Sequence, residues 1–255
     1  MPSAHPLSFV SIVLPCFDEE PNVAAAVYEA RAAGAACAER HEVIVVDDGS
    51  TDHTATIAAA LTATLPDVRL VRHARNCGYG AAVRAGIDSS RGDWVVLTDG
   101  DRQFDLTELP LLVETAEASG ADLVAGYRIH RADPVHRRAA AHAWNRLVRA
   151  SFGVGVRDVD CAFKLARGDA LRALPLESDG AMISTELLVR AQLAGWSIAE
   201  VGVHHRPRMA GTPSGGDPRV IVHAFAERRA FQRRLRGQAA RDGSAATPAR
   251  RAALS

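Results

Sequence analysis

The sequence predicts an α/β protein built around a mainly parallel sheet with helices on both faces. Short apolar runs, each closed by turn residues, alternate with longer alanine-rich stretches along the first half of the chain. This alternation is typical of β-α-β units, in which buried parallel strands are connected by helices. Acidic residues and glycines cluster where the apolar runs end. Because ligands bind at the carboxyl ends of the strands in such sheets, these clusters mark the expected site.

The expected elements follow in chain order. Strands are expected within residues 9–15, 41–50, 68–73, 94–101 and 121–126. Helices are expected within residues 19–40, 50–65, 78–90 and 106–120. The strand runs are continuously apolar, as in strands that are covered on both faces. The helical stretches are longer and have helix-forming composition.

Composition indicates a globular protein with one sizeable core. The chain has 255 residues, 47% of them apolar, and no formal net charge. We expect one domain over residues 1–230, followed by a basic tail over residues 231–255 that becomes disordered after a short helix. The four cysteines form no C-x-x-C pair, so neither a zinc knuckle nor a disulfide framework is indicated.

The same composition limits the expected partners and location. No apolar run reaches the roughly 18 to 20 residues of a membrane span, and the amino end lacks the basic region of a signal peptide. We therefore expect a cytoplasmic protein whose membrane contact, where it occurs, is peripheral. Zero net charge argues against a general nucleic-acid-binding protein, which would need a basic surface.

Acidic residues follow the first two expected strands. After the first, Glu19 lies in the run LPCFDEE, where acids are also favoured simply by the dipole of the next helix. After the second, the run VVDDGSTD contains Ser50 and Asp52, which can cap a helix. Capping does not account for Asp47 and Asp48. Ionised carboxylates at this position can accept hydrogen bonds from a nucleobase or from ribose hydroxyls.

The third strand end is rich in glycine. The run RNCGYGAAVRAG does not have the spacing of a dinucleotide-binding fingerprint, and the preceding strand is not the first one. We expect Gly78 and Gly80 to let the backbone approach a ligand, and Arg75 to supply charge there.

The fourth strand ends in a D-x-D pattern formed by Asp99 and Asp101, with Gln103 two residues later. Carboxylate and amide oxygens are ligands that suit Mg²⁺ or Mn²⁺, particularly when substrate phosphates complete the coordination. A polar turn after a buried strand is the alternative interpretation. The other acidic strand ends at the same edge favour the metal site.

Six ordered motifs give the chain a family resemblance. They are SIVLPCFDEEPNV, EVIVVDDGSTDHT, RNCGYGAAVRAGI, LTDGDRQFD, DVDCAFKL and STELLVRAQLAGWSIAEVGVHHRPR. Together they resemble a family 2 glycosyltransferase of the branch that includes polyprenyl- and dolichyl-phosphate sugar synthases. The resemblance implies a GT-A fold, a nucleotide-sugar donor, a divalent cation (Mg²⁺ or Mn²⁺) and inversion at the anomeric carbon.

The resemblance also implies roles for residues on the donor side. It assigns nucleoside reading to Asp48, with Pro15 and Glu19 lining the same pocket. It maps the D-x-D motif onto Asp99 and Asp101, and we expect Asp101 and Gln103 to ligate the cation while Asp99 assists at the phosphate or sugar. A bound cation would stabilise the nucleoside diphosphate as it leaves.

On the acceptor side, Asp158 matches the acid that the family places near the acceptor, where it would orient or deprotonate it. Glu186 is the second candidate, and an ordinary acid at a helix start is its alternative. The resemblance places Arg128 near the phosphates. Arg206 and Arg208 could clamp phosphate oxygens, on a segment that Gly211, Gly215 and Gly216 would allow to close.

The region after the fifth strand is also basic. It contains an aromatic residue, Trp144, together with Arg128, Arg131, Arg137, Arg138, Arg146 and Arg149. A helix of this kind fits an anionic bilayer surface, and a solvated helix face is the alternative. The run GTPSGGDPR has no lysine where dolichyl-phosphate mannose synthases carry Ser-Lys, so the acceptor stays open.

Three interpretations of function therefore compete. The leading one is metal-dependent transfer of a hexose from a GDP- or UDP-sugar to a polyprenyl phosphate. The second keeps the donor chemistry and replaces the acceptor by a soluble small-molecule or saccharide hydroxyl. The third, a non-catalytic module that binds nucleotide sugars, is disfavoured because the D-x-D motif, Asp158 and Glu186 are all present.

Overall fold

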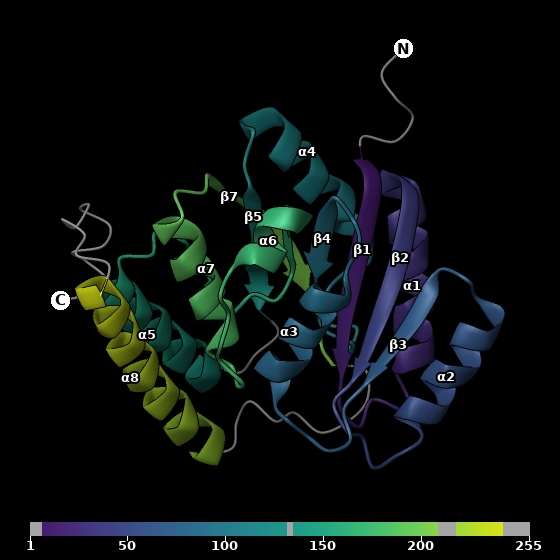
Figure 1. Cartoon of the computed structure of the whole chain (residues 1–255), viewed down its shortest axis with the longest axis horizontal. Coiled ribbons are helices and arrows are strands. Elements are labelled where there is room, and N and C mark those ends of the chain that lie inside the picture. The colour runs from purple at the N-terminus through teal and green to yellow at the C-terminus, as the bar shows by residue number, and fades with distance from the viewer. Residues whose placement is uncertain (1–6, 132–134, 209–217, 242–255) are drawn as a thin grey trace.

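The computed structural model describes residues 7–131, 135–208 and 218–241, and its strands form one sheet in the order β3-β2-β1-β4-β6-β5-β7 (Figure 1). The strands are β1 (Leu7–Cys16), β2 (Ala38–Asp47), β3 (Val68–Arg72), β4 (Trp94–Leu97), β5 (Leu123–Arg131), β6 (Lys164–Arg167) and β7 (Ile198–His205). All neighbouring pairs are parallel except those that involve β6, which runs antiparallel to both β4 and β5. The expected mainly parallel sheet is therefore confirmed.

Helices cover both faces of this sheet. They are α1 (Val23–Cys37), α2 (Thr54–Thr64), α3 (Tyr79–Ser89), the 3₁₀ turn η1 (Leu106–Glu108), α4 (Leu109–Ser119), α5 (Val135–Phe152), α6 (Gly168–Ala173), α7 (Ile183–Leu193) and α8 (Pro218–Arg241). One core cluster joins the sheet to α1, α2 and α4, and the other joins it to α3, α5, α6, α7 and α8. The expected strands and helices of the first half are all present.

The reversed strand β6 decides which segment borders the site. Lys164 at the start of β6 pairs with Leu97 at the end of β4 and with Ala125 of β5. The segment that precedes β6, rather than one that follows it, therefore lies at the carboxyl edge of the parallel strands. Sequence periodicity did not reveal this, because a four-residue strand carries almost no pattern.

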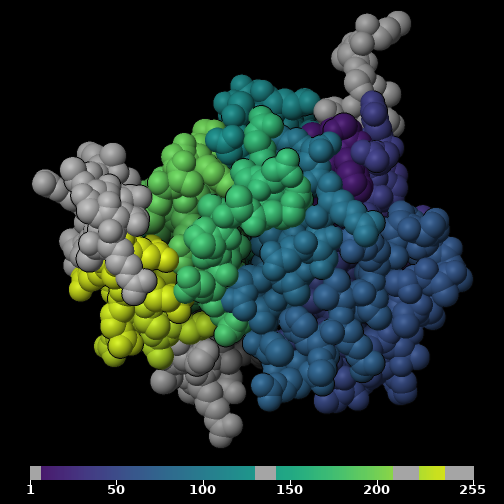
Figure 2. Space-filling model, viewed as in Figure 1, coloured from purple at the N-terminus to yellow at the C-terminus, as the bar shows by residue number. Residues whose placement is uncertain are grey.

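The carboxyl-terminal helix α8 corrects the expected domain boundary. The helix runs without a break through residue 230, where the tail was expected to begin. Phe231 and Leu235 are buried, and the Phe231 ring packs on Phe152 of α5 at a centroid distance of 5.3 Å. Figure 2 shows α8, in yellow, at the surface of the molecule. The domain thus includes α8, and residues 242–255 lie outside the described residues.

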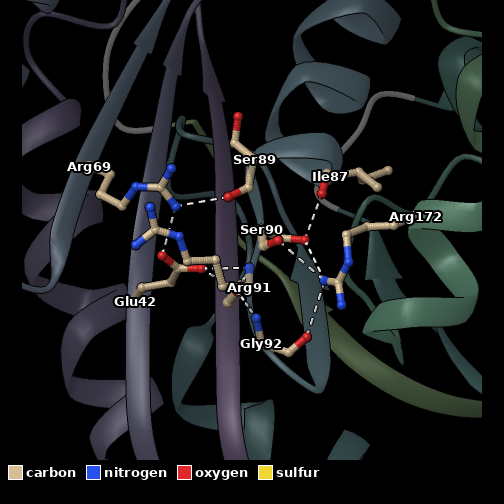
Figure 3. Close-up of polar contacts among 9 residues, drawn as sticks. Glu42, Arg69, Ile87, Ser89, Ser90, Arg91, Gly92 and Arg172 are labelled. Atoms are coloured by element: carbon tan, nitrogen blue, oxygen red, sulfur yellow. Dashed lines mark hydrogen bonds and ion pairs between the residues drawn. The ribbon is translucent and has the colours of Figure 1, made fainter.

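A polar cluster fastens the opposite edge of the sheet (Figure 3). Buried Glu42 accepts hydrogen bonds from Ser11 Oγ at 2.7 Å, from the Arg91 backbone at 2.8 Å and from Arg69 Nη1 at 2.9 Å. Beside it, Arg172 Nη1 of α6 donates to the Gly92 carbonyl at 3.2 Å. These bonds join β1, β2, β3 and the segment that precedes β4. This end of the sheet is therefore stabilised without the acids of the carboxyl edge.

Candidate active site

The loops after β1 and β2 are clipped together by their own polar groups. Asp18 has a left-handed backbone (φ 53°), and its carboxylate accepts from the Thr51 backbone at 2.7 Å. The Glu19 backbone donates to Thr54 Oγ1 at 2.8 Å. The carboxylate of Glu19 is 7% exposed and accepts from Asn22 Nδ2 at 2.7 Å. These contacts fix Glu19 at the edge where the donor site was expected.

Asp48 anchors the loop that follows β3. Its Oδ1 lies 2.6 Å from His73 Nδ1 and accepts from the Cys77 backbone at 2.9 Å, while Oδ2 accepts from the Gly78 backbone at 2.8 Å. Atoms of Asp48, His73 and Cys77 that could ligate a metal lie within 4.8 Å of one another. The hydrogen bonds just described account for this proximity. Asp48 is therefore held rigidly at the carboxyl edge of the sheet.

Arg75 belongs to this same loop and its side chain is exposed. The loop passes so close to Gly49 that a Cβ there would lie 2.3 Å from the Arg75 carbonyl carbon, and the φ of Gly49 is +71°. Only glycine fits that position. The structure thus brings the Arg75 backbone next to Gly49, the residue that follows Asp48.

The Asp-Gly-Asp turn is packed tightly on the end of β1. The Gly100 backbone donates to the Pro15 carbonyl at 3.3 Å, and a Cβ on Gly100 would lie 2.4 Å from Cys16 Sγ. Arg102 takes a left-handed conformation (φ 61°), and its guanidinium contacts Glu29 of α1 at 2.6 Å. These contacts fix the turn, in which Asp101 is 8% exposed and Asp99 is half-buried.

The two aspartates are crowded acids. Burial and the charge of Asp101 raise the pKa of Asp99 to about 7, and burial also raises the pKa of Asp101. The Gln103 backbone donates to Asp101 Oδ1 at 3.1 Å, and the side-chain amide of Gln103 donates to the Arg206 carbonyl at 3.2 Å, which leaves its amide oxygen available as a ligand. Two carboxylates that ionise with difficulty, next to an amide oxygen, form a donor set that fits a hard divalent cation. The residues present therefore fit Mg²⁺ or Mn²⁺.

Tyr79 contacts Asp99, and the sequence did not reveal this contact. Its hydroxyl donates to Asp99 Oδ1 at 2.9 Å. Burial, followed by the charge of Asp99, raises the pKa of Tyr79 well above its usual value, so the phenol remains a donor. No sequence pattern pairs the first residue of a helix with the end of the strand that follows it.

The two expected phosphate clamps differ in their contacts. Arg208 Nη1 lies 3.3 Å from Asp101 Oδ2, and its other terminal nitrogen contacts Glu19. Arg206 pairs instead with Asp105 and is 44% exposed. The structure therefore brings Arg208, but not Arg206, onto the acids of the donor site. The expected hinge glycines, Gly211, Gly215 and Gly216, lie outside the described residues.

Asp158 and Arg128 form a buried bidentate ion pair. Arg128 Nε lies 2.6 Å from Asp158 Oδ2, and Nη2 lies 2.8 Å from Oδ1. Burial acts to lower the pKa of Arg128, but the hydrogen bonds and charge of Asp158 raise it above its ordinary value. Asp158 therefore faces a permanent cation. That arrangement suits a residue that orients Arg128 better than one that removes a proton.

Lys164 is a buried cation that the sequence analysis did not single out. It is 1% exposed, its Nζ lies 3.4 Å from the Val159 carbonyl and also contacts the Cys161 carbonyl, and burial lowers its pKa. A lysine inside the apolar run AFKLA was the available signal, because lysine is almost never fully buried without a polar reason. A small cavity at this edge is lined in part by Pro15, Tyr79, Thr98, Lys164 and Ser184.

Glu186 has a different position from the one expected. It is completely buried, accepts from Arg190 Nε at 2.7 Å, and accepts from the Ser178 and Glu177 backbones at 2.7 Å and 3.1 Å. Burial acts to raise the pKa of Glu186, but the Ser178 and Arg190 hydrogen bonds lower it. The cavity is lined by other side chains of α7. These contacts indicate that Glu186 shapes the loop before α7 and does not face the sugar.

The glycines around Tyr79 also serve another purpose than the expected one. A Cβ on Gly78 would lie 2.4 Å from the Asp179 carbonyl oxygen, and one on Gly80 would lie 2.4 Å from the Ser178 carbonyl oxygen. The close approach that these glycines allow in the structure is to protein backbone. They admit the backbone of the loop that precedes α7.

Comparison with known proteins decides the family. The model of the family described as glycosyl transferase family 2 matches residues 11–174. The chain belongs to glycosyl transferase family 2. The resemblance drawn from the six motifs is thereby confirmed.

Curated relatives of this family 2 glycosyltransferase act on lipid phosphates, according to their names. An undecaprenyl-phosphate 4-deoxy-4-formamido-L-arabinose transferase from Shewanella sediminis is 34% identical over 221 residues, which cover 86% of this chain and 65% of the relative. A dodecaprenyl-phosphate galacturonate synthase from Rhizobium johnstonii is 33% identical over 218 residues, covering 83% and 63%. The chain thus spans a little under two thirds of the length of these relatives.

Solved structures support the fold. Glucosyl-3-phosphoglycerate synthase from Mycobacterium tuberculosis, in complex with Mn²⁺, UDP and glucosyl-3-phosphoglycerate, matches with a TM-score of 0.64 and 24% identity, covering 81% of this chain and 73% of that one. The expected GT-A fold of this family 2 glycosyltransferase is confirmed.

Proposed function

We propose that the protein is an inverting, metal-dependent enzyme that transfers a sugar from a nucleotide donor to a polyprenyl phosphate. The observation that carries this proposal is the convergence at one sheet edge of crowded carboxylates, Asp99 and Asp101, with a cation, Arg128, whose side chain is only 11% exposed. The two carboxylates fit a divalent cation, which would in turn bind a diphosphate. Arg128 fits an anionic acceptor. The polyprenyl-phosphate relatives support the same assignment.

On the donor side, the chain's own residues bind and orient the nucleotide. We assign the nucleoside to the pocket of Pro15, Glu19 and Asp48, with exposed Arg75 near the phosphates. UDP is the nucleotide we favour, because the structurally similar synthase was solved with UDP. A cation held by Asp99, Asp101 and Gln103 would supply positive charge to the leaving diphosphate. Arg208, which contacts Asp101 and Glu19, would add guanidinium charge to the same oxygens.

On the acceptor side, the ion pair distinguishes a lipid phosphate from a hydroxyl. A hydroxyl acceptor needs a general base, whereas a phosphate is ionised near neutral pH and can attack without one. Both oxygens of Asp158 already accept hydrogen bonds from Arg128. We therefore assign phosphate binding to Arg128 and its orientation to Asp158. Transfer to a soluble hydroxyl is the less favoured alternative.

Thermal stabilisation by nucleotides tests the donor assignment. We expect UDP with Mn²⁺, at about 100 times its Kd, to raise the melting temperature by about 5 to 10 °C, because ligand binding to the native state adds about 2.7 kcal/mol. UDP without Mn²⁺, or GDP with it, should raise it much less. Adding a polyprenyl phosphate to a donor turnover assay then tests the acceptor. Transfer to a soluble hydroxyl, with none to the lipid phosphate, would contradict the proposal.

We also propose that the enzyme contacts the membrane surface peripherally. Within the parts of the chain that the structure describes, no helix is both long and apolar enough to cross a bilayer. Exposed arginines lie on α5 and α8, namely Arg146, Arg149, Arg229, Arg233 and Arg236. Trp144 is turned inward, because its indole nitrogen donates to Asp160 at 3.3 Å and its ring packs on Phe225. The expected contact therefore depends on the arginines and not on Trp144.

Liposome binding checks this contact. We expect co-sedimentation with anionic vesicles at 50 mM salt that falls sharply at 500 mM salt, since surface charges are screened over a few ångströms at high salt. Replacing Arg229 and Arg233 by Gln should weaken binding. Co-sedimentation no greater than with neutral vesicles would show that these arginines only form a solvent-exposed helix face.

A further inference from the structure

Tyr79 occupies a position from which it controls one of the two crowded aspartates. Its hydroxyl donates to Asp99 Oδ1 at 2.9 Å. We infer that Tyr79 is a positioning residue, which fixes the orientation of the Asp99 carboxylate for the divalent cation. The inference rests on the proposed function in one respect, because it assumes that Asp99 and Asp101 hold that cation. Outer-shell hydrogen bonds of this kind commonly set the geometry of metal-binding carboxylates.

The backbone on both sides of Tyr79 is clamped. Gly80 donates its backbone N–H to the Asp179 carbonyl at 2.7 Å, and Ala81 donates to the same oxygen at 3.2 Å. The loop approaches so closely that a Cβ on Gly78 or Gly80 would lie only 2.4 Å from a loop carbonyl oxygen. Tyr79 is thus the one side chain between two glycines that are needed for close contact. Its ring has little freedom to leave Asp99.

The loop that clamps Tyr79 is itself held from two helices. Glu186 of α7 accepts from the Ser178 and Glu177 backbones at 2.7 Å and 3.1 Å. Gly180 donates its backbone N–H to Glu227 of α8 at 2.8 Å. Hydrogen bonds and the short backbone segments between them therefore lead from buried Glu186 through this loop to α3 and on to Asp99. This series gives Glu186, an expected catalytic acid, a supporting role in the donor site.

Geometry at Asp99 explains why such support matters. Asp99 and Asp101 are one residue apart and repel each other when both are ionised, so an unrestrained Asp99 would rotate away from Asp101. The Tyr79 hydroxyl holds Oδ1 and thereby directs Oδ2. A cation that needs both carboxylates then finds Asp99 already oriented, and the cost of ordering that side chain on binding is reduced.

Substitution by phenylalanine isolates the hydroxyl. Mn²⁺ binding is measured from the electron paramagnetic resonance signal of the free ion, with UDP and separately with GDP present. We expect Tyr79→Phe to bind Mn²⁺ about 10-fold more weakly than the wild type. The melting temperature of the free protein should change by less than about 4 °C, since one hydrogen bond is lost. Tyr28→Phe is the control, because Tyr28 is 53% exposed on α1.

A second substitution moves Tyr79 without removing its hydroxyl. Gly80→Ala should push α3 away from the loop and weaken Mn²⁺ binding by a similar factor, and the double variant Tyr79→Phe/Gly80→Ala should be no weaker than the worse single variant. Equal Mn²⁺ affinity of Tyr79→Phe and wild type would overturn the inference while leaving the proposed cation site intact. A wild type that binds no Mn²⁺ with either nucleotide would overturn both.

Discussion

Asp101→Asn is expected to lower sugar transfer by about 1,000-fold and to remove the Mn²⁺ dependence of nucleotide binding. Loss of the Asp101 carboxylate removes one of the two charged ligands of the cation, and electrostatic groups at a leaving diphosphate are commonly worth that factor. Turnover of the donor in the presence of polyprenyl phosphate measures the first effect. Thermal stabilisation by UDP, with and without Mn²⁺, measures the second.

Unlike its activity, the stability of the metal-free Asp101→Asn variant is not expected to fall. The pKa of Asp101 is raised by burial in the metal-free protein. A carboxyl group with a raised pKa opposes folding once the pH exceeds that pKa, because its charged form is less favourable in the folded state than in the unfolded state. We therefore expect the metal-free variant to melt no lower than the wild type at pH 8. Asp88→Asn, at an exposed position on α3, is the matched control for both measurements. Unchanged Mn²⁺ dependence in Asp101→Asn would reduce the Asp-Gly-Asp sequence to a structural turn.

The ion pair between Asp158 and Arg128 gives the second large effect. Asp158→Asn leaves the buried guanidinium of Arg128 without its counter-charge, which typically costs about 3 to 5 kcal/mol of unfolding free energy. We expect transfer to polyprenyl phosphate to fall by at least about 100-fold, while UDP-dependent stabilisation persists. Urea denaturation and turnover assays measure the two consequences.

A double variant separates function from stability at this pair. Arg128→Met/Asp158→Asn removes both charges, so its unfolding free energy should recover much of what each single variant loses. Its transfer activity should stay low, because no cation is left to bind the acceptor phosphate. Full turnover in Asp158→Asn with unchanged donor binding, or recovery of turnover in the double variant, would contradict the roles assigned to the pair.

The donor half of the site could be predicted from sequence because its residues follow strands directly. Asp48, Asp99 and Asp101 each come after a strong apolar run, and parallel strands bring their carboxyl ends to one edge. Local pattern therefore determined three-dimensional position. The partners of these acids could not be predicted in this way, since His73, Tyr79 and Arg208 reach them from elements that no periodicity relates to the strand ends.

The acceptor half was harder to predict for a physical reason. Glu186 looked catalytic because a helix start with an acid can face a site, but complete burial and three hydrogen bonds direct it to the preceding loop.

Phe231 looked like the start of a tail because the surrounding sequence is basic. Its ring nevertheless fills a gap between α5 and α7, a tertiary contact that overrides local composition.

Reversal of β6 divides the candidate site between the loops that follow parallel strands and the β5–β6 connection. Donor residues up to Gln103 follow parallel strands, whereas Asp158 and its neighbours lie between the ends of β5 and β6, two adjacent strands whose backbone pairing is independent of that segment. Within the β5–β6 connection, α5 is tied to the core through Val148 and Phe152, whereas the segment around Asp158 can vary without altering the register of the sheet. Such an arrangement allows enzymes with one donor chemistry to acquire new acceptors through variation confined to a single insertion.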